Sequence, residues 1–269
     1  MPAKVDLYNS AYGNYEADVY REIRVATYGQ DFGQTSWVTT EESSAIPRQM
    51  GIQHGSRVLE VGCGSGRYAL HLAEMTEAQI LGVDVNEFGV SNANGLSTEA
   101  GLADRAQFQA CDVSKPLPFE NAGFDAAFSN DVICHIPGRA SLLRELFRVL
   151  KPAAKLLFSD ALVIGGTISH EEIAARSSIG YYIFSPPGEN ERLLLDAGFS
   201  ALSATDTTAN AAAISARWRG ARSNNKDQLI AIEGESNFQG LQNFLACVHK
   251  LTSERRLLRY VYLAERPPA

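Results

Sequence analysis

Long apolar runs, clusters of basic residues and paired cysteines are all missing from this 269-residue sequence. No apolar stretch approaches the roughly 18 residues of a membrane-spanning helix, and the N-terminus has no basic segment followed by an apolar one, as a secretory signal has. The net charge is −7 and no run of Lys or Arg occurs, which disfavours nucleic acid as a partner. We therefore expect a cytoplasmic protein that binds neither nucleic acid nor membranes.

The cysteines are few and scattered, at Cys63, Cys111, Cys134 and Cys247, and none belongs to a Cys-x-x-Cys pair. This use of cysteine is typical of small buried apolar side chains. The first three lie at the ends of predicted strands, so a soft-metal site or a reactive thiol stays open as an alternative. We assign no metal ligands.

The clearest pattern is the segment 58–67, in which a short apolar strand is followed by a turn with three glycines, Gly62, Gly64 and Gly66. Residues 68–75 then predict a helix. Glycine lets the backbone approach a ligand closely, and the start of a helix offers unpaired N–H groups. This combination indicates a nucleotide-cofactor site at the head of a doubly wound sheet.

The spacing of these glycines bears on which nucleotide is bound. A dinucleotide loop needs its third glycine one residue later, where this chain has Arg67. Glu60 precedes the first glycine by two residues, and its carboxylate would repel a pyrophosphate but suits a cation such as the ammonium of a methionine moiety. A purely structural glycine turn is the alternative.

Polar residues follow the next strands at the same edge of the sheet. Asp84 comes 18 residues after Gly66 and suits the two hydroxyls of a ribose, with a helix cap as the alternative. Asp112 and Val113 suit the amino group and the ring of an adenine, with an Asx-turn as the alternative. The cofactor-binding residues predicted in this region are Glu60, Gly62, Gly64, Gly66, Asp84, Val85, Asp112, Val113 and Asn130.

Strands and helices alternate along most of the chain, which predicts a parallel, doubly wound α/β sheet in one domain of residues 1–269. Residues 1–38 are rich in aromatics and predict a helical cap, either closed over the site or simply packed on the sheet. Residues 39–160 form the cofactor-binding core. Residues 161–187 and 208–252 predict helical insertions on the substrate side, the first of them a lid or a packing elaboration. The candidate substrate contacts in the lid are Arg176, Tyr181 and Tyr182.

Together these residues resemble the class I S-adenosylmethionine-dependent methyltransferases over residues 57–160. The matches are the glycine segment, Asp84, the pair Asp112-Val113, and the fourth and fifth strands with Lys151-Pro152. The resemblance implies a Rossmann-like sheet of seven strands with the last one antiparallel, and S-adenosylmethionine as cofactor with S-adenosylhomocysteine as product. At positions 153 and 154 the chain has two alanines where the family usually has glycines.

A narrower resemblance is to phosphoethanolamine and glycine/sarcosine N-methyltransferases, on the segment from Asp131 to Pro137 and on the N-terminal tyrosines. It implies that Tyr12 pairs with His135 over the site, that Gln34 meets the methionine end of the cofactor, and that Tyr20 contacts the substrate. Phosphobase enzymes carry a tyrosine where this chain has Ala161, so phosphate binding is not carried over.

Function follows from the chemistry of an activated methyl group. The protein must hold a nucleophile about 3–3.5 Å from the methyl carbon and exclude water, and a histidine is suited to remove a proton near neutral pH. We predict methyl transfer to a small-molecule acceptor, a metabolite amine or natural-product nitrogen, by a monomer or homodimer with His135 as general base or orienting group. The alternatives are C- or O-methylation of a larger apolar natural product, and a subunit that binds the cofactor without catalysis.

Overall fold

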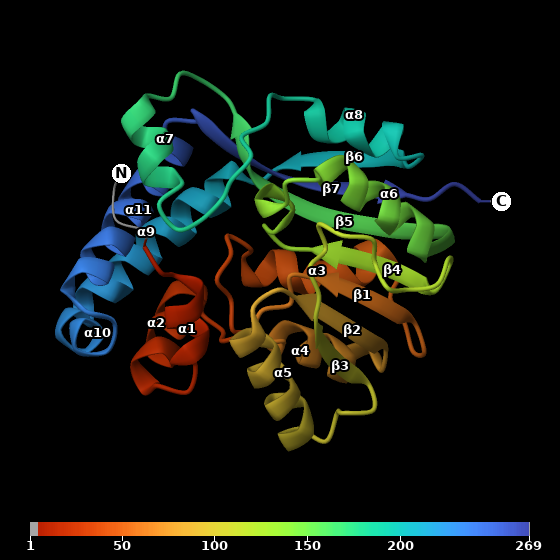
Figure 1. The fold of residues 1–269 in the computed structure, drawn as a ribbon, viewed down its shortest axis with the longest axis horizontal. Coiled ribbons are helices and arrows are strands. Elements are labelled where there is room, and N and C mark those ends of the chain that lie inside the picture. The colour runs from red at the N-terminus through yellow and green to blue at the C-terminus, as the bar shows by residue number, and fades with distance from the viewer. Residues whose placement is uncertain (1–4, 269) are drawn as a thin grey trace.

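The fold is built around a seven-stranded sheet in the order β3-β2-β1-β4-β5-β7-β6, in a computed structural model that describes residues 5–268 and, for Ala201, the backbone alone (Figure 1). All strands run parallel except β7, which is antiparallel to both of its neighbours. The predicted Rossmann-like sheet with an antiparallel last strand is therefore confirmed. The strands are β1 Arg57–Val61, β2 Gln79–Asp84, β3 Ala106–Ala110, β4 Phe124–Ser129, β5 Leu150–Ile164, β6 Ser200–Asp206 and β7 Leu257–Glu265.

Helices cover both faces of the sheet. Alternate residues of each strand face opposite sides, so that Val58 joins one apolar core and Leu59 joins the other. The first core contains side chains of α3 (Thr40–Met50), α4 (Arg67–Thr76) and α5 (Glu87–Glu99), and the second contains those of α6 (Arg139–Val149) and α8 (Glu189–Asp196). Burying both faces stabilises the central strands β1 and β4, whose residues are mostly apolar and buried.

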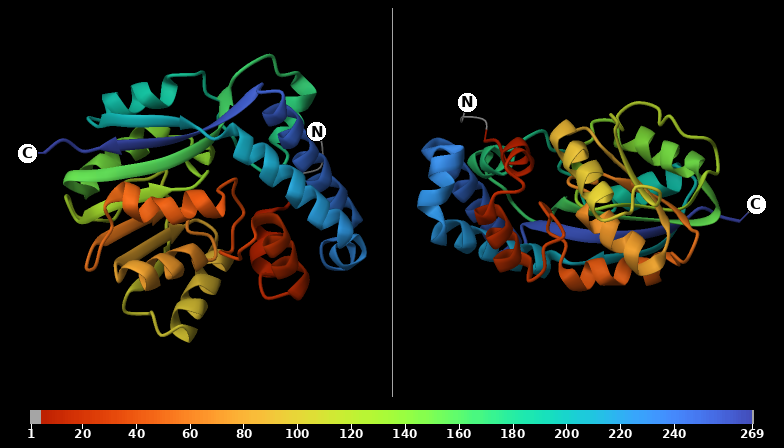
Figure 2. Two further views of the ribbon diagram at one scale, coloured as in Figure 1. Left: turned by 180° about the vertical axis from the view of Figure 1, so that it is seen from behind. Right: turned by 90° about the horizontal axis from the view of Figure 1, so that it is seen from below.

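A third core lies beside the sheet and joins the two ends of the chain. Figure 2 shows the N-terminal helices next to the C-terminal ones, and the apolar side chains of these helices form one cluster. These helices are α1 Tyr8–Gly13, α2 Asp18–Tyr28, α9 Thr208–Asn224, α10 Lys226–Glu233 and α11 Glu235–Ser253. The short helix α7, His170–Arg176, packs against α11. Within residues 5–268, none of the helices is apolar over a length that could cross a membrane.

Local sequence signals explain several boundaries. Thr39 caps α3 through a reciprocal pair of bonds with Glu42, and Gly51 ends that helix in the left-handed conformation. β5 continues straight through the position of the family's two glycines: Ala153 adopts a φ of 61°, which glycine would adopt without strain. The segment 1–38, for which a helical cap was predicted, contains the two helices α1 and α2, and the short helix α10 was not predicted separately from the helical insertion 208–252.

Candidate functional site

The glycine turn joins β1 to α4 and faces the carboxyl ends of the strands. Its three glycines have φ values of 80°, 52° and 70°, in the left-handed region that side chains disfavour. A Cβ on Gly62 would meet Val132, and one on Gly64 would lie 2.5 Å from the hydroxyl of Tyr12. These two glycines line a large cavity, whereas Gly66 does not.

Gly66, which was predicted to bind the cofactor, does not line the cavity and has a packing role in the structure. A Cβ at this position would lie 2.6 Å from Ala93 on α5 and 2.7 Å from the ring of Phe108 on β3. The residue therefore allows α4 to pack closely against its neighbours, which is a known use of the third glycine in such turns.

The cavity has a volume of about 370 Å³ and lies over the ends of β1, β2 and β4. Its wall comes from the glycine turn, from the loops after β2, β3 and β4, and from residues 32–38 of the N-terminal segment. Gly33 lets this segment approach the turn, because a Cβ there would lie 2.1 Å from Ser65 Oγ. The predicted cofactor residues that line the cavity are Gln34, Glu60, Gly62, Gly64, Asp84, Val85, Asp112, Val113 and Asn130.

Two carboxylates differ in how they are held at this cavity. Glu60 is 5% exposed, and its Oε2 has no partner within the described chain. Burial, and then the charge of Asp84, raises the pKa of Glu60 well above its usual value. Asp84 accepts bonds of 2.9 Å from Gly64 N and 2.8 Å from Asn86 N, so it also fixes the glycine turn. Glu60 is thus a buried carboxyl whose ionised form a bound cation would stabilise.

The outer wall of the cavity is more open. Val85 is 72% exposed, while Val113 is buried. Asp112 accepts bonds from the backbone and hydroxyl of Ser114 and forms an ion pair with Lys115, so the Asx-turn considered as an alternative is present. The side chain of Gln34 accepts from Phe32 N and shapes its own loop.

His135 lies in the short helix Ile133–His135 after β4 and contacts the cap. Its Nδ1 is 3.0 Å from the carbonyl oxygen of Tyr181, and its Nε2 is 3.1 Å from the hydroxyl of Tyr8. Because a carbonyl only accepts, Nδ1 carries the proton, and Nε2 of the neutral ring accepts from Tyr8. Burial, and then the charge of Arg176, lowers the pKa of His135 to about 4. The imidazole is therefore uncharged at neutral pH.

The predicted pairing of Tyr12 with His135 is wrong, because Tyr8 makes that contact. The two tyrosines are one turn apart on α1 and their rings stack with centroids 6.4 Å apart. The hydroxyl of Tyr12 instead bonds to Thr35 Oγ1 at 2.9 Å, above the glycine turn. The family resemblance implied a contact from an N-terminal tyrosine, and the structure makes it one helical turn earlier, from Tyr8 to η1, the helix of His135.

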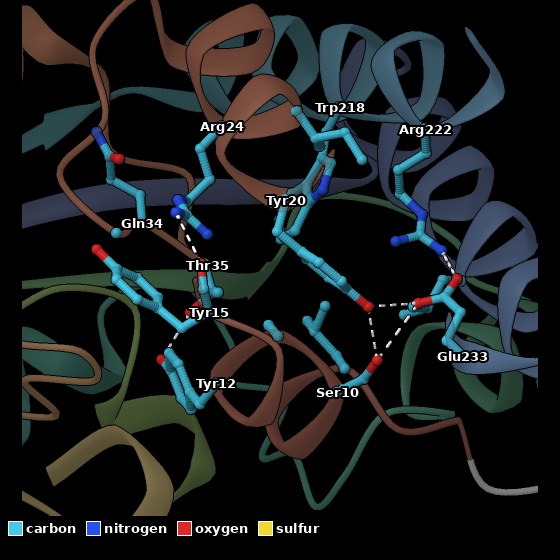
Figure 3. Close-up of a pocket in the computed structure, with 15 residues that line it drawn as sticks. Ser10, Tyr12, Tyr15, Tyr20, Arg24, Gln34, Thr35, Trp218, Arg222 and Glu233 are labelled. Carbon is cyan, nitrogen blue, oxygen red and sulfur yellow. Dashed lines mark hydrogen bonds and ion pairs between the residues drawn. The ribbon is translucent and has the colours of Figure 1, made fainter. Parts of the chain in front are cut away.

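Tyr20 and Tyr181 were predicted to contact the substrate, but neither side chain lines the large cavity. Tyr20 belongs to a second cavity, of only about 20 Å³, where its hydroxyl bonds to Ser10 and to Glu233, the partner of Arg222 (Figure 3). Tyr181 is 58% exposed and meets His135 only through its carbonyl.

Tyr182 and Arg176, the other two predicted substrate contacts, do not line the large cavity either, but they lie close to His135. The ring of Tyr182 packs on the imidazole with centroids 4.3 Å apart, and the guanidinium of Arg176 lies 4.4 Å from the centre of that same ring. Arg176 is 1% exposed.

The sequence analysis assigned no role to Asp131, whose carboxylate links distant segments of the chain beside the site. It accepts bonds from Trp37 N, from Ser159 Oγ and from Arg259 Nε, all between 2.8 and 2.9 Å. The residue has a φ of 59° and is 8% exposed. Trp37, Ser159 and Arg259 are far apart in the sequence, so no local pattern could have shown this network.

The comparisons with known proteins agree with this geometry. A family model described as a methyltransferase domain matches residues 52–179. Phosphoethanolamine N-methyltransferase 1 of Triticum aestivum is 29% identical over 227 residues, which are 83% of this chain and 45% of that protein. The 27-O-demethylrifamycin SV methyltransferase of Amycolatopsis mediterranei is 26% identical over 168 residues, 59% of this chain and 61% of that protein. The chain thus spans less than two thirds of either relative.

One solved structure is similar over nearly the whole chain. It is a phosphoethanolamine N-methyltransferase 2 of Haemonchus contortus in complex with phosphomonomethylethanolamine and S-adenosylhomocysteine. The TM-score is 0.80 at 22% identity, over 97% of this chain and 60% of that one. At this level of identity the likeness supports the fold.

Proposed function

Because residues 52–179 form a class I S-adenosylmethionine-dependent methyltransferase domain, we propose that this protein transfers a methyl group to a small-molecule acceptor whose nucleophilic atom is oriented by His135. One observation carries the proposal: an uncharged imidazole with an accepting Nε2 lies on the same cavity wall as Glu60 and Asp84.

The residues of the cavity fit the cofactor. The unpartnered Oε2 of Glu60 would bind the ammonium of the methionine end, and Asp84 would accept from the ribose hydroxyls. Asp112 and Val113 would contact the adenine, and Gly64 would let the backbone approach the ligand. S-adenosylmethionine, when bound, supplies a methyl group activated by its sulfonium.

The chain's own part in the reaction is to position the acceptor and to take up its proton. An acceptor N–H or O–H becomes much more acidic as its bond to the methyl carbon forms, so a weak base with a pKa of about 4 suffices if it is uncharged and correctly placed. Nε2 of His135 satisfies both conditions. The Tyr8 hydroxyl, which donates to Nε2, would accept from the acceptor and pass on a proton to the imidazole, and the ring of Tyr182 would help to exclude water.

The surroundings of His135 offer no free carboxylate to an acceptor that carries an ammonium group. Asp131 is the carboxylate near His135, and Trp37, Ser159 and Arg259 already occupy it. The proposed nucleophile is therefore a neutral nitrogen or an oxygen. O-methylation of a natural product stays a second candidate, since the wall beside His135 also contains the apolar Val132, Ile136 and Pro137.

The test combines calorimetry and kinetics. Wild type should bind S-adenosylhomocysteine and transfer labelled methyl groups to members of a panel of amines and phenols. His135→Asn and Tyr8→Phe should keep the affinity for S-adenosylhomocysteine and lose turnover. Tyr12→Phe is the matched comparison, one helical turn away, and should keep turnover because its hydroxyl bonds to Thr35.

Three results would contradict the proposal. Wild type that binds the cofactor without transferring methyl groups to any acceptor would favour the non-catalytic subunit. Full turnover of His135→Asn would remove the imidazole from the mechanism. An equal loss in Tyr12→Phe and Tyr8→Phe would restore the pairing that the narrower resemblance implied.

A further inference from the structure

A buried ion pair borders the small second cavity beside α1. Arg222 on α9 pairs with Glu233, the last residue of α10, and their side chains are 3% and 1% exposed. Figure 3 shows this pair next to Tyr20 and Ser10. A carboxylate this deeply buried is stable only where cations and hydrogen-bond donors surround it. The partners of Glu233 therefore show which parts of the chain it holds together.

The two carboxylate oxygens of Glu233 have different partners. Oε1 pairs with Arg222, while Oε2 accepts from the hydroxyl of Tyr20 at 3.1 Å. Ser10 Oγ lies 2.8 Å from that hydroxyl and 3.4 Å from Oε2 itself. One carboxylate thus joins α1, α2, α9 and α10, through hydrogen bonds that its negative charge strengthens.

Helix α1 depends on such contacts for its position. It has only six residues and no side-chain cap, and helices of this length are not stable in isolation. Two asparagines connect it to α5: Asn86 donates to Asn9 at an exposed position, and Asn92 donates to the carbonyl of Tyr12. These bonds join uncharged groups, whereas the link to Glu233 is buried and charge-assisted. We therefore expect the link to Glu233 to be the stronger anchor of α1.

The same helix carries Tyr8 to the site of reaction. The hydroxyl of Tyr8 is 3.1 Å from Nε2 of His135, and Ser10 follows two residues later, on another side of the helix. A displacement of α1 by about 1 Å would lengthen the contact of Tyr8 beyond hydrogen-bonding distance. The placement of the Tyr8 hydroxyl thus depends on the anchor at Ser10.

We propose that Glu233 is a positioning residue for methyl transfer, which holds α1 through Tyr20 and Ser10 so that the hydroxyl of Tyr8 stays against His135. The proposal rests on the proposed function and adds a residue to it from the insertion 208–252. Glu233 does not line the large cavity and acts on the reaction only through Tyr8.

The first experiment follows His135 by NMR and needs no acceptor. The Hε1 resonance of His135, assigned by its loss in His135→Asn, is titrated in the ligand-free protein. Wild type should titrate near pH 4, because burial, and then the charge of Arg176, lowers the pKa of His135 to about 4. Ser10→Ala and Glu233→Gln should raise this pKa toward 6.5, because a displaced Tyr8 withdraws its hydrogen bond from Nε2 and admits water.

Two further variants calibrate this titration. Tyr8→Phe gives the pKa of His135 without the hydroxyl, and both test variants should approach that value. Glu235→Gln, at an exposed position two residues after Glu233, is the charge-matched control and should titrate as wild type. Ser10→Ala and Glu233→Gln change none of the titratable groups that face the imidazole, which are Tyr8, Tyr182, Arg176 and Asp131.

The second experiment measures turnover with an acceptor that wild type methylates. Glu233→Gln should lower kcat by about 10- to 100-fold, the range that a misplacement of about 1 Å causes, and should keep the affinity for S-adenosylhomocysteine. Ser10→Ala should lower kcat by about 2- to 10-fold, as the loss of one hydrogen bond does, and Ser10→Thr, which keeps the hydroxyl, should restore it. Adding Ser10→Ala to Tyr8→Phe should cause no further loss, because Ser10 acts through Tyr8.

The outcomes separate the two proposals. An unchanged pKa of His135 in Ser10→Ala and Glu233→Gln, or additive losses of kcat in the double variant, would overturn the positioning role. A lower unfolding temperature of Glu233→Gln with unchanged kcat would mean that the ion pair only stabilises the fold. If Glu233→Gln does not fold, Ser10→Ala and Tyr20→Phe, which keep the ion pair, decide the question. If wild type methylates no acceptor, the proposed function fails, and the titration of His135 decides alone whether Glu233 holds α1.

Discussion

Glu60 should make the ligand-free protein less stable as the pH rises, and Glu60→Gln should remove that effect. The folded protein keeps a proton on the buried carboxyl at pH values where the unfolded chain has lost it, because burial and Asp84 raise the pKa of Glu60 well above 4.5. Stability then falls from pH 4.5 up to the raised pKa, by about 1.4 kcal/mol for each pH unit.

The measurement is urea unfolding followed by circular dichroism between pH 4.5 and 8. The difference in free energy of unfolding between Glu60→Gln and wild type should grow with pH and level off at the pKa of Glu60. Glu74→Gln, at an exposed position of α4, should follow wild type at every pH. The same Glu60→Gln variant should bind S-adenosylhomocysteine about 10- to 100-fold more weakly, because the charge that holds the ammonium is gone.

Two results would refute this reasoning. A difference between Glu60→Gln and wild type that stays constant from pH 4.5 to 8 would mean that the carboxyl titrates normally. Equal or tighter binding of S-adenosylhomocysteine by the variant would mean that Glu60 does not hold a cation.

Three further changes test other parts of the structure. Between pH 6.5 and about 4, His135 binds fewer protons in the folded protein than in the unfolded chain. The free energy of unfolding should therefore fall by about 1.4 kcal/mol for each unit of decreasing pH in this range. Urea unfolding of His135→Asn should not show this slope. Gly66→Ala should lower stability by about 1–3 kcal/mol, because the added methyl group would crowd α5. Gly95→Ala, at a helical position with open space, should raise stability by up to about 1 kcal/mol. Equal effects of the two changes on thermal unfolding would contradict the assigned contacts. Arg259→Met should lose about 3–5 kcal/mol, because it leaves the buried Asp131 unpaired, and a loss below 1 kcal/mol would show that water reaches the carboxylate.

Sequence alone predicted the parts of the fold that depend on short-range signals. The capping box at Thr39 and the turn at Gly51 gave both ends of α3, and the alternation of strands and helices indicated the parallel sheet. The antiparallel direction of β7 was implied by the family resemblance, because no pattern in residues 257–265 indicates which strands they pair with. Helix α1 was not predicted separately from the helical cap, because its six residues carry no side-chain cap.

The site was predictable where its residues lie at strand ends and less so where the partners are distant. Glu60 and Asp84 follow from strand position, and both line the cavity. The contact between Tyr8 and His135 depends on which turn of α1 reaches a loop 127 residues later, and the spacing of tyrosines leaves that open.

The position of β7 has a consequence for the order in which the protein is assembled during synthesis. β7 is the last strand to be translated, yet it lies between β5 and β6, so β6 leaves the ribosome with no edge to join. Arg259 on β7 then supplies the cation that pairs with Asp131, a residue 128 positions earlier in the sequence. The pocket over β4 therefore needs β7 for its final shape, and a chain interrupted before β7 would leave β5 and β6 with open edges that favour aggregation.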